Sequence, residues 1–508
     1  MSTAAPRLPY AFAKQHGVLV LGGDEASAQV GLRDGAAPEM LIELRRMLGR
    51  PLLVQPLVQA AFDRRLSELY AGAGLDGAGA VDALDMHGSL DSLVDEIPAA
   101  ADLLESQDDA PIIRLINGIL AEGVRIGASD IHVEPFESAL RVRFRVDGVM
   151  REAVRLPSRI APLIVSRIKV MSRLDIAEKR VPQDGRLSVA MGSKVLDVRV
   201  STLPSRGGER VVLRILDKDQ GTLSLAQLGM PPAVLSDMEQ ALRMPNGIVL
   251  VTGPTGSGKT TTLYAGLGRL NDGSRNILTV EDPVEYAIEG IGQTQVNTTV
   301  GMTFAAGLRS ILRQDPDVVM VGEIRDPETA QIAVQASLTG HLVLSTVHTN
   351  DAVGAITRLR DMGVEPFLLS STVRLVLAQR LLRRLCVHCR APRETDALSR
   401  RVMGGGHAGP LFRAVGCERC NHSGYAGRLG IHEAVVIGDT LRGLIGENAD
   451  EDSIARCAFV GGRRLADAAR DAVAAGLTTL EEAVRVTRQD DATETRPTAM
   501  PEQDRAGV

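Results

Sequence analysis

The 508-residue sequence lacks several features that mark whole classes of protein. No apolar run approaches the ~18 residues that a membrane-spanning helix needs, so we expect a chain that does not cross a bilayer by itself. The opening residues, MSTAAPRLPY, have no apolar core of the kind found in secretion signals, so we expect a cytoplasmic location. Aromatic residues make up 3%, tryptophan is absent and the net charge is −6, so no nucleic-acid partner is expected.

Lysine and arginine are absent from residues 71–110, where acidic residues recur. Together with the glycine and alanine content, this composition predicts a solvated, flexible linker over residues 76–109. An acidic surface helix is the alternative for residues 89–106.

Cysteine is also scarce, and five cysteines are too few for a disulfide scaffold in a chain of this length. Four of them form two C-x-x-C pairs, Cys386 with Cys389 and Cys417 with Cys420. Four thiolates complete a tetrahedral Zn²⁺ site and leave no open position for substrate, so we expect a structural role. Residues 390–416 separate the pairs, longer than the usual spacing of about 15–20 residues, so an extended loop is expected there. A redox pair is the alternative.

Residues 248–260, IVLVTGPTGSGKT, join an apolar strand to a phosphate-binding loop that matches the pattern G-x-x-x-x-G-K-[ST]. Its glycines let the backbone N–H groups curl around a phosphate at the start of a helix. Lys259 is expected to reach the β- and γ-phosphates, and the Thr260 hydroxyl to coordinate Mg²⁺. The expected nucleotide-binding residues are Gly253, Pro254, Thr255, Gly256, Ser257, Gly258, Lys259, Thr260 and Thr261.

Two further apolar strands end in acidic residues. The stretch DVVMVGE closes on Glu323, and ILTVED closes on Glu281 and Asp282. A carboxylate at the carboxyl edge of a strand beside the phosphate loop can organise Mg²⁺ and the attacking water. Glu323 and Glu281 are therefore candidate catalytic acids, with solvated strand ends as the alternative.

Two histidines, His341 and His348, bracket the apolar run 342–347. Their odd separation places them on opposite faces of a continuous strand, so a shared metal site is not expected. We expect one of them, with His348 the candidate catalytic residue, to sense the γ-phosphate. A satisfied structural histidine is the alternative for either.

The order of the elements predicts an α/β protein of several domains. Apolar strands alternate with helical stretches from residue 248 to 345, which indicates a parallel sheet covered by helices on both faces. Upstream, an apolar helix face at 112–120 and alternating strands between 131 and 216 indicate an α+β domain with a mostly antiparallel sheet. The expected segments are a small N-terminal domain 1–75, the linker 76–109, the α+β domain 110–222, the nucleotide-binding domain 223–378, a tetracysteine zinc subdomain 379–432, a helical domain 433–488 and a disordered tail 489–508.

Four sequence blocks, in order, strongly resemble the Walker A, Asp box, Walker B and His box of the secretion-ATPase superfamily of hexameric motors. These blocks are TGPTGSGKTTTLYA, ILTVEDPVEY, LRSILRQDPDVVMVGEIRD and QASLTGHLVLSTVHTND. Upstream, ASDIHVEP, RVRFRVDG, RVPQDGR and SRGGERVVLRIL resemble the second N-terminal domain of that family. The resemblance covers residues 110–485 and implies a RecA-like P-loop ATPase domain, hydrolysis of ATP with Mg²⁺, and a homo-oligomer, expected to be a hexamer.

Within this resemblance, Arg199 and Arg214 occupy positions where arginines of one domain approach the nucleotide held by the next. Physically, a planar and permanently charged guanidinium suits γ-phosphate oxygens as charge develops on them. Arg186 is a third candidate. Without the family, ordinary strand-surface charges would be the alternative, and whether the arginines act within one chain or across subunits stays open.

Residues 7–21, RLPYAFAKQHGVLVL, resemble the N-terminus of the type II secretion ATPases, the general secretory pathway protein E family. This implies a motor that powers pseudopilus assembly and the export of folded proteins across the outer membrane. It also implies docking of the first domain on the cytoplasmic part of the inner-membrane general secretory pathway protein L, and hence a peripheral location on the cytoplasmic face of that membrane. Type IV pilus extension motors share the tetracysteine pattern and are the alternative, with a DNA-uptake motor next. A scaffold with a degenerate ATP site is disfavoured because all four motifs are intact.

Overall fold

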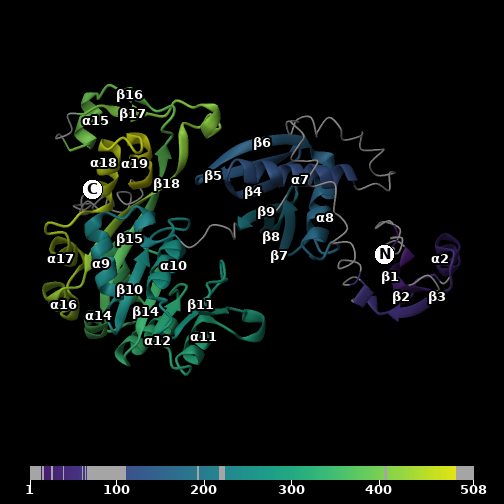
Figure 1. Cartoon of the computed structure of the whole chain (residues 1–508), viewed down its shortest axis with the longest axis horizontal. Coiled ribbons are helices and arrows are strands. Elements are labelled where there is room, and N and C mark those ends of the chain that lie inside the picture. The colour runs from purple at the N-terminus through teal and green to yellow at the C-terminus, as the bar shows by residue number, and fades with distance from the viewer. Residues whose placement is uncertain are drawn as a thin grey trace, which may run out of the picture. The chain divides into compact units, whose positions relative to one another are not determined.

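The computed structural model describes residues 8, 13, 16–23, 27–37, 39–59, 61–62, 65, 110–191, 194–216, 223–404 and 409–487. The chain divides into two compact units, Met1–Asp219 and Gln220–Val508, which are described separately (Figure 1). The expected linker 76–109 and tail 489–508 lie outside the described residues. Within the described ranges, no helix has the length and apolar character needed to span a bilayer.

The first unit begins with a three-stranded sheet in the order β1-β2-β3. Strand β1 (Val18–Gly23) is antiparallel to β2 (Ala28–Arg33), and β2 is parallel to β3 (Leu52–Leu57). Helix α2 (Met40–Leu48) forms the crossover between the two parallel strands, as such a connection requires. Apolar residues of β1, β2 and α2 form the core of this small domain.

A six-stranded antiparallel sheet completes the first unit, in the order β6-β5-β4-β9-β8-β7. Its strands are β4 (Ala128–Pro135), β5 (Ala139–Val146), β6 (Val149–Pro157), β7 (Gln183–Met191), β8 (Lys194–Ser205) and β9 (Gly208–Leu216). Helices α7 (Ala110–Arg125) and α8 (Ala161–Met171), the latter preceded by the short η1 (Ser158–Ile160), pack on one face and share one hydrophobic core with the sheet. The predicted α+β fold with an antiparallel sheet is confirmed.

The second unit is built on a seven-stranded sheet in the order β12-β11-β13-β14-β10-β15-β18. Its strands are β10 (Gly247–Thr252), β11 (Ile277–Glu281), β12 (Gly292–Gln295), β13 (Val318–Val321), β14 (Leu342–Val347), β15 (Val373–Leu385) and β18 (Tyr425–Val436). Every neighbouring pair is parallel except β15 with β18. All residues of β10, β13 and β14 are buried, which is why these strands are mostly apolar in the sequence.

Helices cover both faces of this sheet. One face packs on η2 (Leu225–Leu228), α9 (Pro232–Leu242) and α10 (Lys259–Leu270). The other packs on α11 (Phe304–Ile311), α12 (Pro327–Leu338), α13 (Ala352–Asp361), α14 (Pro366–Thr372), α16 (Asp439–Gly446), α17 (Glu451–Ala458), α18 (Leu465–Ala474) and α19 (Leu480–Thr487). The C-terminal helices α16 to α19 therefore share one core with the nucleotide-binding sheet, although the sequence predicted a separate helical domain at 433–488.

The tetracysteine segment extends from two strands of the seven-stranded sheet. The expected boundaries at 378/379 and 432/433 fall inside β15 and β18, so these two long strands run from the sheet to the cysteines. Between them lie the two-stranded sheet of β16 (Ala391–Arg393) and β17 (Leu411–Arg413), helix α15 (Ala397–Val402) and the short η4 (Glu418–Cys420). Through β15, which pairs with β10, the cysteines are thus tied directly to the strand that borders the phosphate loop.

Candidate nucleotide site and tetracysteine centre

The phosphate loop lies between β10 and α10, which begins at Lys259. Gly253, Gly256 and Gly258 have φ angles of 147°, 79° and 89°, a region that favours glycine. At Gly253 a Cβ would lie 2.4 Å from the carbonyl oxygen of Gln379, and at Gly258 it would lie 2.8 Å from the Gln379 Nε2. These two glycines are therefore required by close packing against β15 as well as by the turn.

Lys259 is 8% exposed and is held inside the loop. Its ammonium donates hydrogen bonds to the carbonyl oxygens of Gly253 (2.7 Å) and Pro254 (3.1 Å), and lies 3.5 Å from His348 Nδ1. Burial lowers the pKa of Lys259 to about 8, and the negative charge of Glu323 opposes that shift. Lys259 therefore lies where its ammonium can exchange the two loop carbonyl oxygens for phosphate oxygens when a nucleotide binds.

Glu323 and His348 follow the neighbouring parallel strands β13 and β14, whose carboxyl ends meet at one edge of the sheet. His348 Nε2 lies 3.2 Å from Glu323 Oε2, and Arg325 forms an ion pair with the other carboxylate oxygen. Burial and the positive charge of Lys259 lower the pKa of His348, which favours a neutral imidazole. Lys259, His348 and Glu323 thus form one continuous chain of polar contacts beside the loop.

His341 lies at the opposite end of β14. Its Nδ1 is 2.8 Å from the Ala336 carbonyl oxygen and 3.2 Å from Thr339 Oγ1, so the ring closes the turn between α12 and β14. Of the two histidines, His348 is the one placed beside the phosphate loop.

Glu281 is the last residue of β11 and is 2% exposed. Its carboxylate accepts hydrogen bonds from Thr279 Oγ1 (2.5 Å), from Gln293 Nε2 (3.1 Å) and from the Tyr264 hydroxyl. Burial, with the nearby Glu281 charge, raises the pKa of Tyr264 and keeps the phenol protonated as a donor. Because Tyr264 belongs to α10, Glu281 anchors the helix that begins at Lys259. The catalytic role of Glu281 stays a prediction.

The residues of the loop fit a nucleoside triphosphate with Mg²⁺. The loop leads into the N-terminus of a 12-residue helix, where unpaired N–H groups and the helix dipole attract phosphate. Thr260, in the first turn, is exposed, which leaves its hydroxyl open to a metal ion. Lys259 and Glu323 supply the cation and the carboxylate that such a site needs.

The three candidate arginines of the first unit lie in one row across neighbouring strands. Arg199 on β8 pairs directly with Arg186 on β7 and with Arg214 on β9. Arg214 Nε donates to Asp130 Oδ1 at 2.9 Å. The row therefore gathers three positive charges on neighbouring strands, and Asp130 balances part of that charge. The spacing in the sequence did not establish that these arginines lie together.

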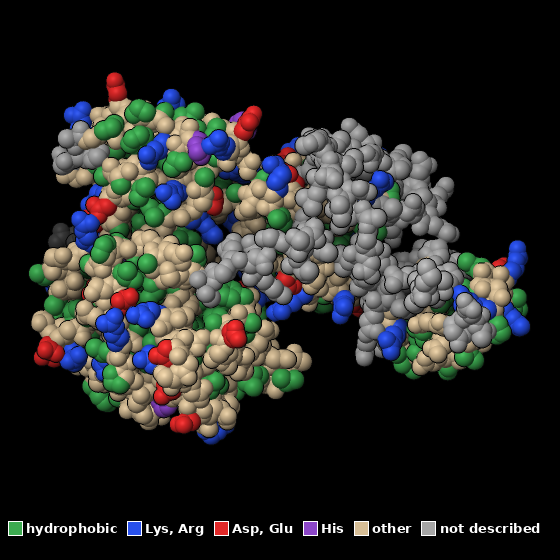
Figure 2. Space-filling model, viewed as in Figure 1, with side chains coloured by type: hydrophobic (Ala, Val, Ile, Leu, Met, Phe, Trp, Pro, Cys, Tyr) green, Lys and Arg blue, Asp and Glu red, His purple; other side chains and the backbone are tan. Residues whose placement is uncertain are grey.

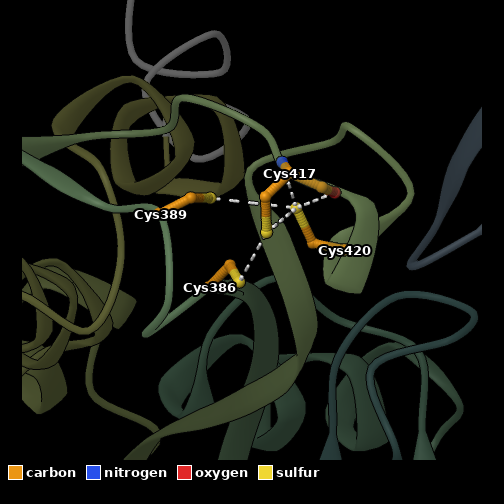
Figure 3. A group of neighbouring side chains, drawn as sticks. All are labelled: Cys386, Cys389, Cys417 and Cys420. Atoms are coloured by element: carbon orange, nitrogen blue, oxygen red, sulfur yellow. Dashed lines mark hydrogen bonds between the residues drawn. The ribbon is translucent and has the colours of Figure 1, made fainter.

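The four cysteines converge at the ends of β15 and β18 (Figure 3). Their sulfur atoms all lie within 4.8 Å of one another, with Sγ–Sγ distances of 3.9 Å for Cys386–Cys417, 3.8 Å for Cys389–Cys420 and 3.7 Å for Cys417–Cys420. A tetrahedron of thiolates at the Zn–S distance of about 2.3 Å requires sulfurs about 3.8 Å apart. The donor set therefore fits zinc.

Backbone N–H groups support the thiolates. Gly416 donates to Cys389 Sγ (3.3 Å), and Cys417 and Gly424 both donate to Cys420 Sγ (3.2 Å each). Although burial acts in the opposite direction, the two N–H groups and the neighbouring thiols lower the pKa of Cys420 to about 6. A thiolate of this kind is ready to bind a cation.

Residues 105–485 match the family model of the type II/IV secretion system proteins, and residues 7–70 match that of the first N-terminal domain of GSPII protein E. The chain is 55% identical over 492 residues to the type II secretion system protein E of Aeromonas hydrophila, covering 96% of this chain and 98% of the relative. The chain belongs to the type II secretion system protein E family. Its protein E relatives include that of Pseudomonas aeruginosa, 56% identical over 494 residues (96% of this chain, 98% of the relative), and the type II secretion system ATPase E of Vibrio cholerae, 52% identical over 490 residues (95% and 97%).

Two solved structures share the fold of this protein E family member. The Legionella pneumophila ATPase DotB aligns with a TM-score of 0.56 at 20% identity, covering 74% of this chain and 95% of DotB. The pilus retraction motor PilT with bound ADP aligns with a TM-score of 0.50 at 26% identity, covering 74% of this chain and 98% of PilT. These comparisons confirm the predicted fold class and the predicted ATPase activity in type II secretion.

Sequence reasoning missed four residues that shape this site, namely Tyr264, Gln293, Arg325 and Gln379. Arg325 had a signal, because a cation two positions after Glu323 lies near the same strand end. The other three act through contacts between distant segments, and no local pattern marks them.

Proposed function

We propose that this chain is the motor of a type II secretion system, in which ATP hydrolysis powers pseudopilus assembly and the export of folded proteins across the outer membrane. The observation that carries the proposal is the contact chain Lys259–His348–Glu323 beside the phosphate loop, in a protein matched to the protein E family over 96% of its length. The match of residues 7–70 to the first N-terminal domain of GSPII protein E favours type II secretion over pilus extension and DNA uptake. On the face drawn in Figure 2, basic and acidic side chains are interspersed over the described surface, unlike the basic stripe typical of DNA motors.

At the loop, each residue has a distinct part. Backbone N–H groups from Thr255 to Thr261 bind the phosphates, and Lys259 balances the charge that develops on the β- and γ-phosphates. The Thr260 hydroxyl and the Glu323 carboxylate are placed to hold Mg²⁺, which neutralises phosphate charge when bound. Glu323 also orients the attacking water. Neutral His348 carries a single N–H, which it donates to the γ-phosphate in place of Glu323 when nucleotide is bound.

The arginine row completes the site from the second N-terminal domain. We infer that Arg199 and Arg214, with Arg186 beside them, bind the γ-phosphate of a nucleotide held in a neighbouring subunit of a hexameric ring. The register that brings the three guanidinium-bearing residues side by side on one sheet supports an anionic ligand for this row.

Mixed oligomers test this arrangement. Lys259→Ala and Arg214→Ala chains, each inactive alone, should regain part of the ATPase rate when assembled together, because the first supplies an intact arginine row to the intact loop of the second. If mixing restores nothing, the arginine acts within its own chain. A normal ATPase rate in the Arg214→Ala protein would show that Arg214 has no part in the nucleotide site.

We infer further that the first domain, 1–75, binds the cytoplasmic part of the inner-membrane secretion protein L, which places the motor on the cytoplasmic face of that membrane. Large apolar side chains on α2, on β3 and directly after β3 are exposed: Ile42 73%, Met47 58%, Leu53 57% and Val58 61%. Several large exposed apolar groups on one small domain favour a protein partner. Ile42→Asp combined with Leu53→Asp should abolish binding of the full chain to membranes that carry protein L, while leaving ATP hydrolysis in solution unchanged. Retained binding would exclude this surface.

A further inference from the structure

Gln379 lies in the middle of β15 and is 3% exposed. The preceding residue, Ala378, pairs with Thr252, the last residue of β10 before the phosphate loop. No nucleotide-binding motif includes Gln379, and the roles assigned above leave it without a function. Its position nevertheless places a polar side chain directly beneath the loop.

The side chain of Gln379 bonds to the loop and to the helix at the same time. Its Nε2 donates to the Ser257 carbonyl oxygen at 2.9 Å, and its Oε1 accepts from Thr262 Oγ1 at 2.6 Å. Ser257 and Thr262 flank Lys259 in the chain and are 3% and 0% exposed. One amide therefore ties the loop backbone before the lysine to a side chain of the helix after it.

Close packing supports the same point. The backbone oxygen of Gln379 and its Nε2 occupy the space that a side chain would take at Gly253 and at Gly258, respectively. The first and last glycines of the phosphate pattern thus both abut this one residue. The shape of the loop therefore depends on close packing against Gln379 as well as on the sequence of the loop itself.

Only an amide satisfies both contacts, because it carries a donor and an acceptor in one plane. Glutamate would set a carboxylate oxygen against the Ser257 carbonyl, and leucine would leave two buried polar groups without this partner. His432, which faces Gln379 on β18, is 2% exposed and makes no hydrogen bond through either ring nitrogen to a described residue. Burial lowers its pKa to about 4, so it adds no charge beside the amide.

We propose that Gln379 is a positioning residue for ATP binding and hydrolysis. Its amide holds Ser257 and Thr262 so that the loop N–H groups and the Lys259 ammonium face the phosphates before nucleotide arrives. Preorganisation of this kind raises affinity because the loop loses less freedom on binding. The inference rests on nucleotide binding at the loop, which Lys259→Ala tests independently.

The test measures the dissociation constant for a fluorescent ADP analogue, and KM and kcat for ATP, in the full chain. Gln379→Leu is expected to raise the dissociation constant and KM about tenfold or more, with a smaller effect on kcat. Gln379→Glu should raise the dissociation constant and KM in the same way, although its carboxylate can still accept the hydrogen bond from Thr262. The matched control is Val376→Ala on the same strand, whose side chain packs in the core on the opposite face of the sheet. It should lower the melting temperature and leave the dissociation constant within about twofold.

A double-variant cycle separates positioning from general destabilisation. Thr262→Val should also weaken nucleotide binding. The double variant Gln379→Leu, Thr262→Val should bind nucleotide no worse than Gln379→Leu alone, because both substitutions break the same hydrogen bond between these two side chains. Three results overturn the inference: unchanged affinity in Gln379→Leu, an equal loss in Val376→Ala, or effects of the two variants that multiply. In each of these cases Lys259→Ala can still abolish binding, so the proposed function stands or falls separately.

Discussion

Replacing Glu482 with glutamine should destabilise the second unit far more than the same change at the adjacent Glu481. The Glu482 side chain is 0% exposed and accepts hydrogen bonds from Arg383 Nη2 (2.8 Å) and Arg485 Nη2 (2.7 Å), as well as from the Arg383 backbone N–H (3.1 Å). Glu481 also pairs with an arginine, Arg393, but its side chain is 63% exposed. The two neighbours therefore make the same kind of contact in opposite environments.

The expected magnitude follows from the pKa of Glu482. Burial alone would raise it, but the hydrogen bonds from Arg485 and Arg383 hold the pKa at about 2, against an ordinary value of 4.5. At ~1.4 kcal/mol per pH unit this corresponds to about 3 kcal/mol of stability, the lower end of the range for breaking a buried ion pair. For Glu481→Gln the exposed pair predicts less than about 1 kcal/mol.

Unfolding followed by circular dichroism as a function of pH is the appropriate assay. Because the folded-state pKa of Glu482 is depressed, its contribution is complete above about pH 4.5 and is lost as the pH falls towards about 2. The difference between the native chain and Glu482→Gln should therefore be full at pH 7 and shrink through that window. Equal destabilisation by the two variants at pH 7, or a difference that does not change with pH, would refute the reasoning.

Three further predictions concern the nucleotide and metal sites. Since burial holds the pKa of Lys259 at about 8, nucleotide affinity should fall by up to about tenfold per pH unit above that value, and Lys259→Arg should remove this dependence in the same titration. Glu323→Gln should keep ADP affinity and lower the ATPase rate by about 10²–10⁴-fold, so an active variant would exclude Glu323 as the group that orients the water. Cys420→Ser should reduce zinc, measured by plasma mass spectrometry, from about one ion per chain towards zero, whereas Cys457→Ser on α17 should leave it unchanged.

The central parallel strands could be predicted from sequence because burial on both faces makes them mostly apolar. Strands β15 and β18 could not, because charged residues interrupt them. Arg380 is 2% exposed and donates to the Asn350 carbonyl oxygen, and Arg383 lies over the Tyr425 ring and pairs with Glu482. Arg380 is thus buried and Arg383 half-buried, each against a partner far away in the chain.

The same distinction applies to the site. The phosphate loop is a local motif, so its residues could be named from the sequence alone. The arginine row depends on the register of three strands, and the contacts of Gln379 depend on β15 lying beside β10. Register and strand order are tertiary facts that spacing along the chain does not encode.

Strand β15 also has a mechanical consequence. From Gln379, beneath the phosphate loop, to Cys386, the residue that follows the strand, the chain spans about 23 Å at ~3.3 Å per residue. Apart from one irregularity between Arg383 and Leu385, this segment is already near its maximum length, so it has little slack to absorb a displacement. A coil or a loop of the same residue count would yield under load. In this fold, a force on the cysteine centre is transmitted along β15 to the phosphate loop.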